Sequence, residues 1–191
     1  MNGLIRDALI ESSNLLPTDE KTTVCVFPST DPNAVSGVTA GAGKIIILYN
    51  TFYTDELLQT VIAHEYHHSV WTEKHLTDSP QTILSSLVFE GKAVMFEKLV
   101  YPDSTYTTTV NYSYNNDYWS KIEPDLNKTD GKRTSEILFG GDNLPSGYGY
   151  SEGFKMVKSY LELHPNLSPE EWTGISAKEI YESGHYADNY K

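Results

Sequence analysis

The sequence is poor in cysteine, in basic residues and in long apolar runs, and each shortage excludes a class of protein. Cys25 is the one cysteine among 191 residues, which excludes an internal disulfide and a cysteine-based zinc site. Lysine and arginine number 14 against 26 aspartates and glutamates, a net charge of −12 that argues against binding to nucleic acid or to an anionic membrane. No stretch reaches the roughly 18 apolar residues of a membrane span. Any metal must therefore be bound by histidine, aspartate or glutamate.

The N-terminal segment lacks the pattern of a secretory signal. Arg6, Asp7 and Glu11 interrupt its apolar residues, and no small-residue cleavage site follows them. We therefore expect a cytoplasmic protein, although a leader removed earlier would leave no trace in this sequence. With 191 residues, of which 39% are apolar, the chain is long enough to form one domain over residues 1–191 around a core that needs no disulfides.

Hydrophobic periodicity predicts a helix followed by a short run of strands. Apolar residues at helical spacing predict a helix within residues 1–17, where Pro17 ends it. Two β-branched segments, residues 22–27 and 44–49, predict strands, and residues 35–39 in the loop between them are a candidate for brief pairing. The second of the two strands is also expected to offer an edge with which an extended substrate could pair.

The remainder of the chain is predicted to be mainly helical. One helix is expected from Thr54 to about residue 74, and a second from Ser79-Pro80 to about residue 99. Residues 101–116 predict an irregular segment, after which shorter helices are expected over residues 118–126, over residues 154–163 and after Ser168 and Ser176. The sequence therefore predicts a mainly helical α+β fold with a small sheet near its N-terminus.

The first long predicted helix contains the candidate metal-binding segment His64-Glu65-Tyr66-His67-His68. His64 and His68 are four residues apart, so both imidazoles leave the same helix face and can bind one zinc ion at about 2.0–2.1 Å. Glu65 points beside the ion, where its carboxylate can take a proton from a water molecule on the metal. The alternative, that these are ordinary buried or surface histidines, is weakened by the helical context and by an available third ligand.

The third ligand of such a zinc ion is either a distant histidine or an acid on the next helix. Glu90 follows His68 by 22 residues, and two antiparallel helices with a short connection would bring it beside the histidines. Gly91 supports this arrangement, because glycine inside a helix costs about 1 kcal/mol relative to alanine and marks the close approach of another element, here the histidine helix. Taken alone, Glu90 would be interpreted as a solvated helical glutamate.

The other histidines have no motif around them. His67 lies within the same segment, but metal binding by His67 would spoil the placement of Glu65, so we expect it behind the ligands or on the helix flank. His75, His164 and His185 lie near predicted helix ends or in loops, where exposure to solvent is the ordinary explanation.

Together these segments resemble a gluzincin, a metallopeptidase with an HExxH helix and a downstream glutamate. The chain is similar in particular to the YjaZ-like bacterial group of predicted zinc-dependent proteases. Ser36-Gly37-Val38-Thr39 resembles a segment upstream of the motif in that group, and Gly149-Tyr150-Ser151-Glu152-Gly153-Phe154 resembles a turn that opens a downstream helix. The resemblance covers roughly residues 35–180.

The resemblance implies a zincin-like fold and one zinc ion per chain, held by His64, His68 and Glu90. Tyr150, in the glycine-rich turn, is the candidate donor to the oxyanion of the transition state. Tyr148 is the second candidate, and packing or surface exposure is an equally good explanation for either tyrosine.

The sequence departs from the gluzincins at one position. Many of them carry an aspartate four residues after the metal-binding glutamate, where it orients a zinc-bound histidine, whereas this chain has Val94. Glu97 is the candidate substitute. The expected reaction is peptide hydrolysis by a metal-bound water that Glu65 activates, with a peptide or protein as substrate and no nucleic-acid or membrane partner. A zinc hydrolase of a non-peptide amide or ester, and a non-catalytic regulatory domain that binds a metal, are the alternatives.

Overall fold

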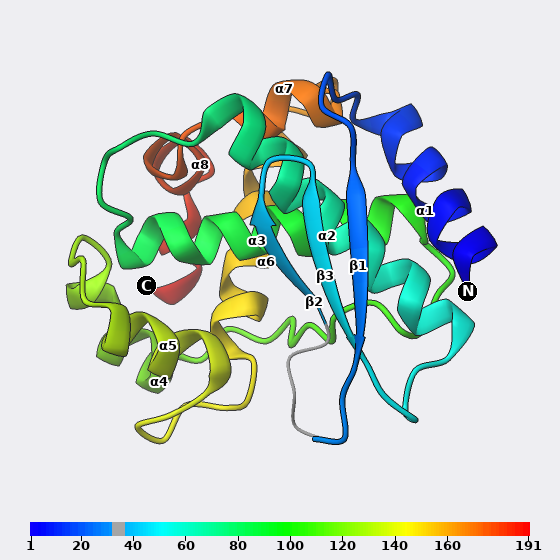
Figure 1. Cartoon of the computed structure of the whole chain (residues 1–191). Helices are drawn as coiled ribbons and strands as arrows, with labels where there is room; N and C mark the ends of the chain where they lie inside the picture. The colour runs from blue at the N-terminus through cyan, green and yellow to red at the C-terminus, as the bar shows by residue number, and fades with distance from the viewer. Residues whose placement is uncertain (32–36) are drawn as a thin grey trace. The chain divides into compact units, whose positions relative to one another are not determined.

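The computed structural model describes residues 1–31 and 37–191 (Figure 1). Contacts within the chain divide these residues into two compact units. Unit 1 consists of Met1–Thr77, Phe96–Thr107 and Pro169–Gly174, and unit 2 of Asp78–Met95, Thr108–Ser168 and Ile175–Lys191. Most described residues are helical and three strands form one sheet, which confirms the predicted α+β class. None of the helices in these residues has the length and hydrophobicity that crossing a membrane would require.

Unit 1 contains the sheet. Its elements are α1 (Asn2–Leu15), β1 (Thr23–Pro28), β2 (Gly37–Gly41), β3 (Lys44–Tyr49), α2 (Asp55–His75) and α7 (Pro169–Gly174). Strand β3 is central, because it pairs in parallel with β1 on one side and antiparallel with β2 on the other. The expectation that β3 offers a free edge is therefore wrong. The pairing segment expected at residues 35–39 is found as β2 from Gly37 onward, while Val35 and Ser36 lie outside the described residues.

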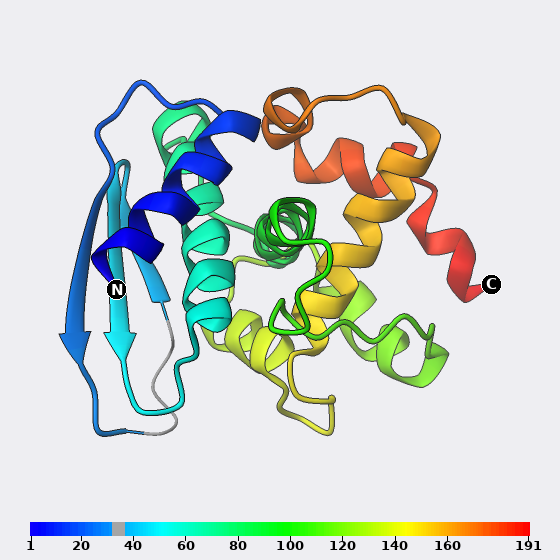
Figure 2. The same ribbon diagram turned by 90° about the vertical axis from the view of Figure 1, so that its right-hand side faces the viewer.

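One face of the sheet lies against α2 (Figure 2). Burial alternates along β3 between Lys44 and Leu48, which places the buried isoleucines on that face. Ile45 and Ile47 are 1% and 0% exposed, and in the antiparallel register they lie opposite Thr39 and Gly37 of β2. Directly paired residues carry their side chains on the same face of a sheet, so β2 and β3 present one continuous surface to the helix. Helix α2 begins as predicted, with the side chain of Thr54 accepting the N–H of Leu57.

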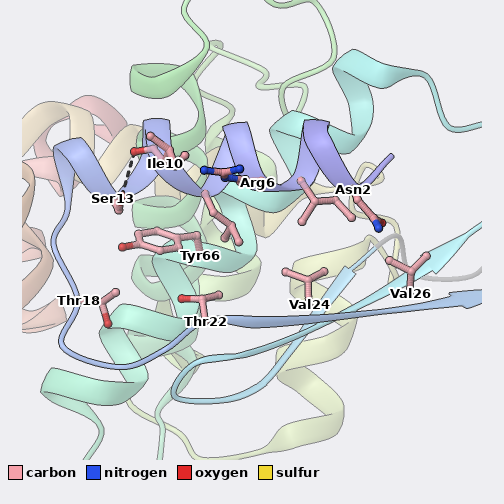
Figure 3. A pocket seen from close by; sticks show the side chains of 11 residues that line it. Asn2, Arg6, Ile10, Ser13, Thr18, Thr22, Val24, Val26 and Tyr66 are labelled. Carbon is pink, nitrogen blue, oxygen red and sulfur yellow. Dashed lines mark hydrogen bonds between the residues drawn. The ribbon is translucent and has the colours of Figure 1, made fainter.

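Helix α1 is held to α2 by the hydroxyl of Tyr66, which donates to the carbonyl oxygen of Leu16 at 2.8 Å. Beside this contact, residues of α1 and β1 line an open pocket of about 550 Å³, with Val24 and Val26 among them (Figure 3). The residues that line this pocket include Tyr66 but none of the predicted site residues. The pocket is thus separate from the predicted chemistry.

Unit 2 is helical in its described residues. It contains residues 83–95 of α3 (Ile83–Val100), α4 (Asn116–Ile122), the 3-10 turn η1 (Glu123–Asp125), α5 (Gly131–Phe139), α6 (Tyr148–Leu163), α8 (Ala177–Ser183) and the 3-10 turn η2 (Tyr186–Tyr190). Its core brings together Leu87 of α3, Trp119 of α4, Ile137 of α5 and Val157 of α6, all 2% exposed or less.

Two predicted helix starts are wrong. Helix α3 begins at Ile83 rather than at Ser79-Pro80, because the side chain of Thr82 accepts the N–H of Ser85 and the N–H of Ile83 donates to the carbonyl oxygen of Lys128. Helix α6 begins at Tyr148, six residues before the predicted start at residue 154. Helix α5 and turn η2 were not predicted, whereas the helices expected after Ser168 and Ser176 are present as α7 and α8.

Candidate metal centre

Helix α2 brings His64 and His68 together on one face. Their side chains are largely buried, with 9% and 5% of each residue exposed, and their rings meet edge to face with centroids 4.7 Å apart. The two Nε2 atoms lie 3.1 Å from each other. Two nitrogens bound tetrahedrally to one zinc ion at about 2.0–2.1 Å lie about 3.3 Å apart. The observed separation therefore fits two ligands that share one zinc ion.

Glu90, half-buried on α3, completes a group of three potential ligands. His64, His68 and Glu90 each offer one ligand atom, and these atoms all lie within 4.8 Å of one another. Imidazole nitrogens and a carboxylate oxygen are donors that zinc accepts. The structure thus contains a group of residues suited to binding a metal, composed of the three predicted ligands; that they bind one stays a prediction.

Glu97, which the sequence offered as the substitute for the missing aspartate, contacts His64. Its Oε2 is 3.1 Å from Nδ1 of His64, and Glu97 is only 2% exposed. A carboxylate beside Nδ1 favours the tautomer with the proton on that atom, which leaves the lone pair of Nε2 for a metal. Val94, at the position of the gluzincin aspartate, is instead a fully buried apolar residue. Glu97 lies seven residues, about two helical turns, after Glu90 on α3.

Glu65, the predicted general base, is 7% exposed on the side of α2 that meets β2. The hydroxyl oxygen of Thr39 lies 2.8 Å from the carboxylate Oε2 of Glu65 and 2.8 Å from its backbone carbonyl oxygen. Sequence analysis gave Thr39 no role beyond its place in a segment that resembles the YjaZ-like group. No sequence pattern predicts that the hydroxyl of a threonine in a strand will contact a glutamate on a helix.

His67 does not belong to the ligand group, as expected. Its ring is fully buried, stacks on Trp172 with centroids 5.6 Å apart and packs against Phe96. Its Nε2 lies 3.3 Å from the hydroxyl of Thr173. His67 is therefore a packing residue that holds α2 to α7.

The reason given for Gly91 is wrong. A Cβ atom added at Gly91 would lie 2.1 Å from the backbone carbon of Gly153, so the element that approaches it is α6 and not the histidine helix. Likewise a Cβ at Gly153 would lie 1.8 Å from the carbonyl oxygen of Leu87. The two glycines let the backbones of α3 and α6 pack directly against each other. The glycine-rich segment thus fixes the part of α3 that carries Glu90.

The two candidate oxyanion donors lie in the first turn of α6. Tyr150 is half-buried, with its ring 6.0 Å from that of Phe139. Tyr148 is 6% exposed, and burial together with the nearby carboxylate of Glu152 raises its pKa. The role of either tyrosine in catalysis stays a prediction.

Comparison with known proteins gives two matches. The family described as "Predicted Zn-dependent protease (DUF2268)" matches residues 2–182. The chain is also 32% identical over 114 residues to "Uncharacterized protein YjaZ" of Bacillus subtilis (strain 168), and this alignment covers 54% of the chain and 42% of that relative. The match thus spans less than half the length of the curated relative. No solved structure matched the chain.

Proposed function

The chain belongs to this family of predicted zinc-dependent proteases, and from that premise we propose that it is a zinc-dependent peptidase of the gluzincin type. The observation that carries the proposal is the group of His64, His68 and Glu90, with the buried carboxylate of Glu65 next to it in sequence. A helix with this group, packed on a small mixed sheet, also supports a zincin-like fold.

In the proposed site, His64, His68 and Glu90 hold one zinc ion per chain and leave one position for water and substrate. The bound ion would polarise the scissile carbonyl and make water a stronger acid. Glu97 keeps the proton of His64 on Nδ1, so that Nε2 faces the ion. The substrate is proposed to be a peptide or a protein. The protein itself is proposed to be cytoplasmic.

Glu65 performs the proton transfers. Its carboxylate takes one proton from the attacking water and later gives it to the amine of the leaving peptide, so that one water is consumed for each bond cleaved. Tyr150 is proposed to donate a hydrogen bond to the oxygen that becomes negatively charged in the transition state, with Tyr148 as the alternative. Its phenol can do so without carrying charge itself.

The test is a digest of a peptide library by the zinc-loaded protein, followed by mass spectrometry. A set of small amides and esters tested in parallel separates a peptidase from another zinc hydrolase. Glu65→Gln should keep one equivalent of zinc by elemental analysis and lose about two to four orders of magnitude in rate, because the proton acceptor is gone. A Glu65→Gln protein that cleaves at the wild-type rate would contradict the proposal.

A further inference from the structure

The β2 strand makes contacts with the candidate general base that the ligand group does not explain. We propose that Thr39 and Gly37 are positioning residues that hold the Glu65 carboxylate in its catalytic place. The inference rests on the peptidase function proposed above. It explains why β2 lies against the turn of α2 that carries Glu65.

Thr39 supplies the polar part of the contact. Its hydroxyl has one hydrogen and lies 2.8 Å from two acceptors, the carboxylate Oε2 and the carbonyl oxygen of Glu65. A charged carboxylate is the stronger acceptor, so the hydrogen bond to Oε2 is favoured when Glu65 is ionised. In either case the hydroxyl oxygen is fixed between the side chain and the backbone of one residue. This arrangement selects one orientation of a side chain that has three rotatable bonds.

Gly37 supplies the space. A Cβ atom at this position would lie 2.9 Å from Cγ of Glu65 and 2.8 Å from Cγ1 of Val61, which is closer than real contacts allow. Gly37 does not have a positive φ, so its backbone conformation is open to other residues and the need for glycine is one of room. Because Gly37 and Thr39 are two residues apart, both lie on the face of β2 that meets α2.

A second anchor holds the β2–β3 hairpin to the same helix. The N–H of Gly43, in the turn between the strands, donates to the hydroxyl of Ser69 at 2.8 Å. Ser69 lies one helical turn after Glu65, so the hairpin is fixed to α2 at two successive turns. A strand tied in this way cannot slide along the helix without breaking both contacts. The position of Thr39 relative to Glu65 is therefore set by the fold and not by one flexible side chain.

Accurate placement matters for a general base, since a misplacement of about 1 Å can lower a rate about a hundredfold. Thr39→Val keeps the shape of threonine but removes the hydroxyl, and Thr39→Ser keeps the hydroxyl. Gly37→Ala forces Glu65 or Val61 to move. Gly3→Ala is the matched control, because a Cβ at Gly3 in α1 meets nothing within 4 Å.

The experiment compares crystal structures, zinc content and steady-state kinetics of these variants with the wild type. We expect Thr39→Val to move the Glu65 carboxylate and to lower kcat about 10- to 100-fold, with KM and zinc content unchanged. Thr39→Ser should restore both the position and kcat. Gly37→Ala should displace Glu65 and lower kcat about a hundredfold, whereas Gly3→Ala should change neither.

The inference is overturned if Glu65 occupies its wild-type position in Thr39→Val, or if Thr39→Val and Thr39→Ser lose the same activity. The first of these outcomes is read from the crystal structure and does not require turnover. A wild-type protein that binds zinc but cleaves no peptide would refute the proposed function, and the position of Glu65 in Thr39→Val would still decide the inference.

Discussion

Glu65 in unit 1 and Glu152 in unit 2 are both buried glutamates within helices, yet their surroundings differ in charge. Glu152 is 1% exposed and is surrounded by three donors, the ammonium of Lys155 at 2.7 Å and the hydroxyls of Tyr186 and Tyr190 at 2.5 Å each. Glu65 is 7% exposed and accepts from the hydroxyl of Thr39, and in the described part of the chain it has no ion-pair partner.

This difference separates a carboxylate paired with fixed donors from the carboxylate that we propose as the general base. Lys155 neutralises Glu152, and burial together with the Glu152 carboxylate raises the pKa of Tyr186, so that hydroxyl stays protonated as a donor. Fixed donors thus occupy both oxygens of Glu152. Among the described residues Glu65 has no such ion-pair partner, and its carboxylate accepts from the hydroxyl of Thr39. Burial alone therefore does not distinguish the two carboxylates, whereas the number of fixed donors around each one does.

The largest effect is expected from removal of His64, a proposed zinc ligand next to Glu65 in the sequence. His64→Ala should lower zinc affinity by more than the 10- to 100-fold that loss of an outer-shell partner typically costs, because a direct ligand is lost. Peptidase activity should be lost with the metal. Elemental analysis after dialysis measures the zinc. His67→Ala, on the same helix but packed against Trp172, is the control and should retain a full equivalent. Full zinc in His64→Ala would remove it from the ligand set.

The next largest effect is expected from substitution of Glu152, and it should lower the free energy of unfolding. Glu152→Gln leaves the buried ammonium of Lys155 without its counter-charge, which should lower the free energy of unfolding by about 3–5 kcal/mol. Glu65→Gln breaks no ion pair, so its free energy of unfolding should change by less than about 1 kcal/mol. Urea denaturation of both variants measures the contrast. Equal losses of stability would remove the distinction between the two glutamates.

A smaller effect is expected from Glu97, the buried acid that contacts the proposed ligand His64. Glu97→Gln keeps the shape of the side chain but weakens its hold on Nδ1 of His64, so zinc affinity should fall about 10- to 100-fold. Competition with a chelator of known affinity measures this change, and nitrogen-15 NMR of His64 reports its tautomer. An affinity within twofold of the wild type would show that Glu97 is a packing residue and not an orienting one.

Much of the secondary structure and the histidine pair of the candidate metal group could be predicted because they follow from local patterns. The spacing of His64 and His68 places them on one face of α2 whatever the rest of the chain does. The strand over residues 44–49 was likewise found with its bounds, since its β-branched run is unambiguous. Features that depend on the residues of one segment alone, such as this spacing and this strand, were predicted correctly.

The misses depend on contacts between distant segments. Gly149 and Gly153 weaken the helical pattern at the start of α6, but packing against Leu87 and Gly91 favours the helix there. Glu97 was named as a candidate for orienting a histidine, but no fixed spacing identifies its partner as His64, 33 positions earlier. Glu152 was quoted as part of a glycine-rich segment without a role, since its hydroxyl partners lie 34 and 38 residues further along the chain.

The smallest effect is expected from Tyr190, the more exposed of the two tyrosines that donate to Glu152. Tyr190→Phe removes one hydroxyl but leaves Lys155 and Tyr186 in place, so the free energy of unfolding should fall by about 1.5 kcal/mol. Tyr186→Phe, at a fully buried position, should cost more, because no water can replace its hydroxyl. Since both hydroxyls contact the same Oε2 atom, the double variant should lose a different amount from the sum of the two single losses. Strictly additive losses in urea denaturation would mean that the two tyrosines act independently, and that Lys155 alone keeps Glu152 structural.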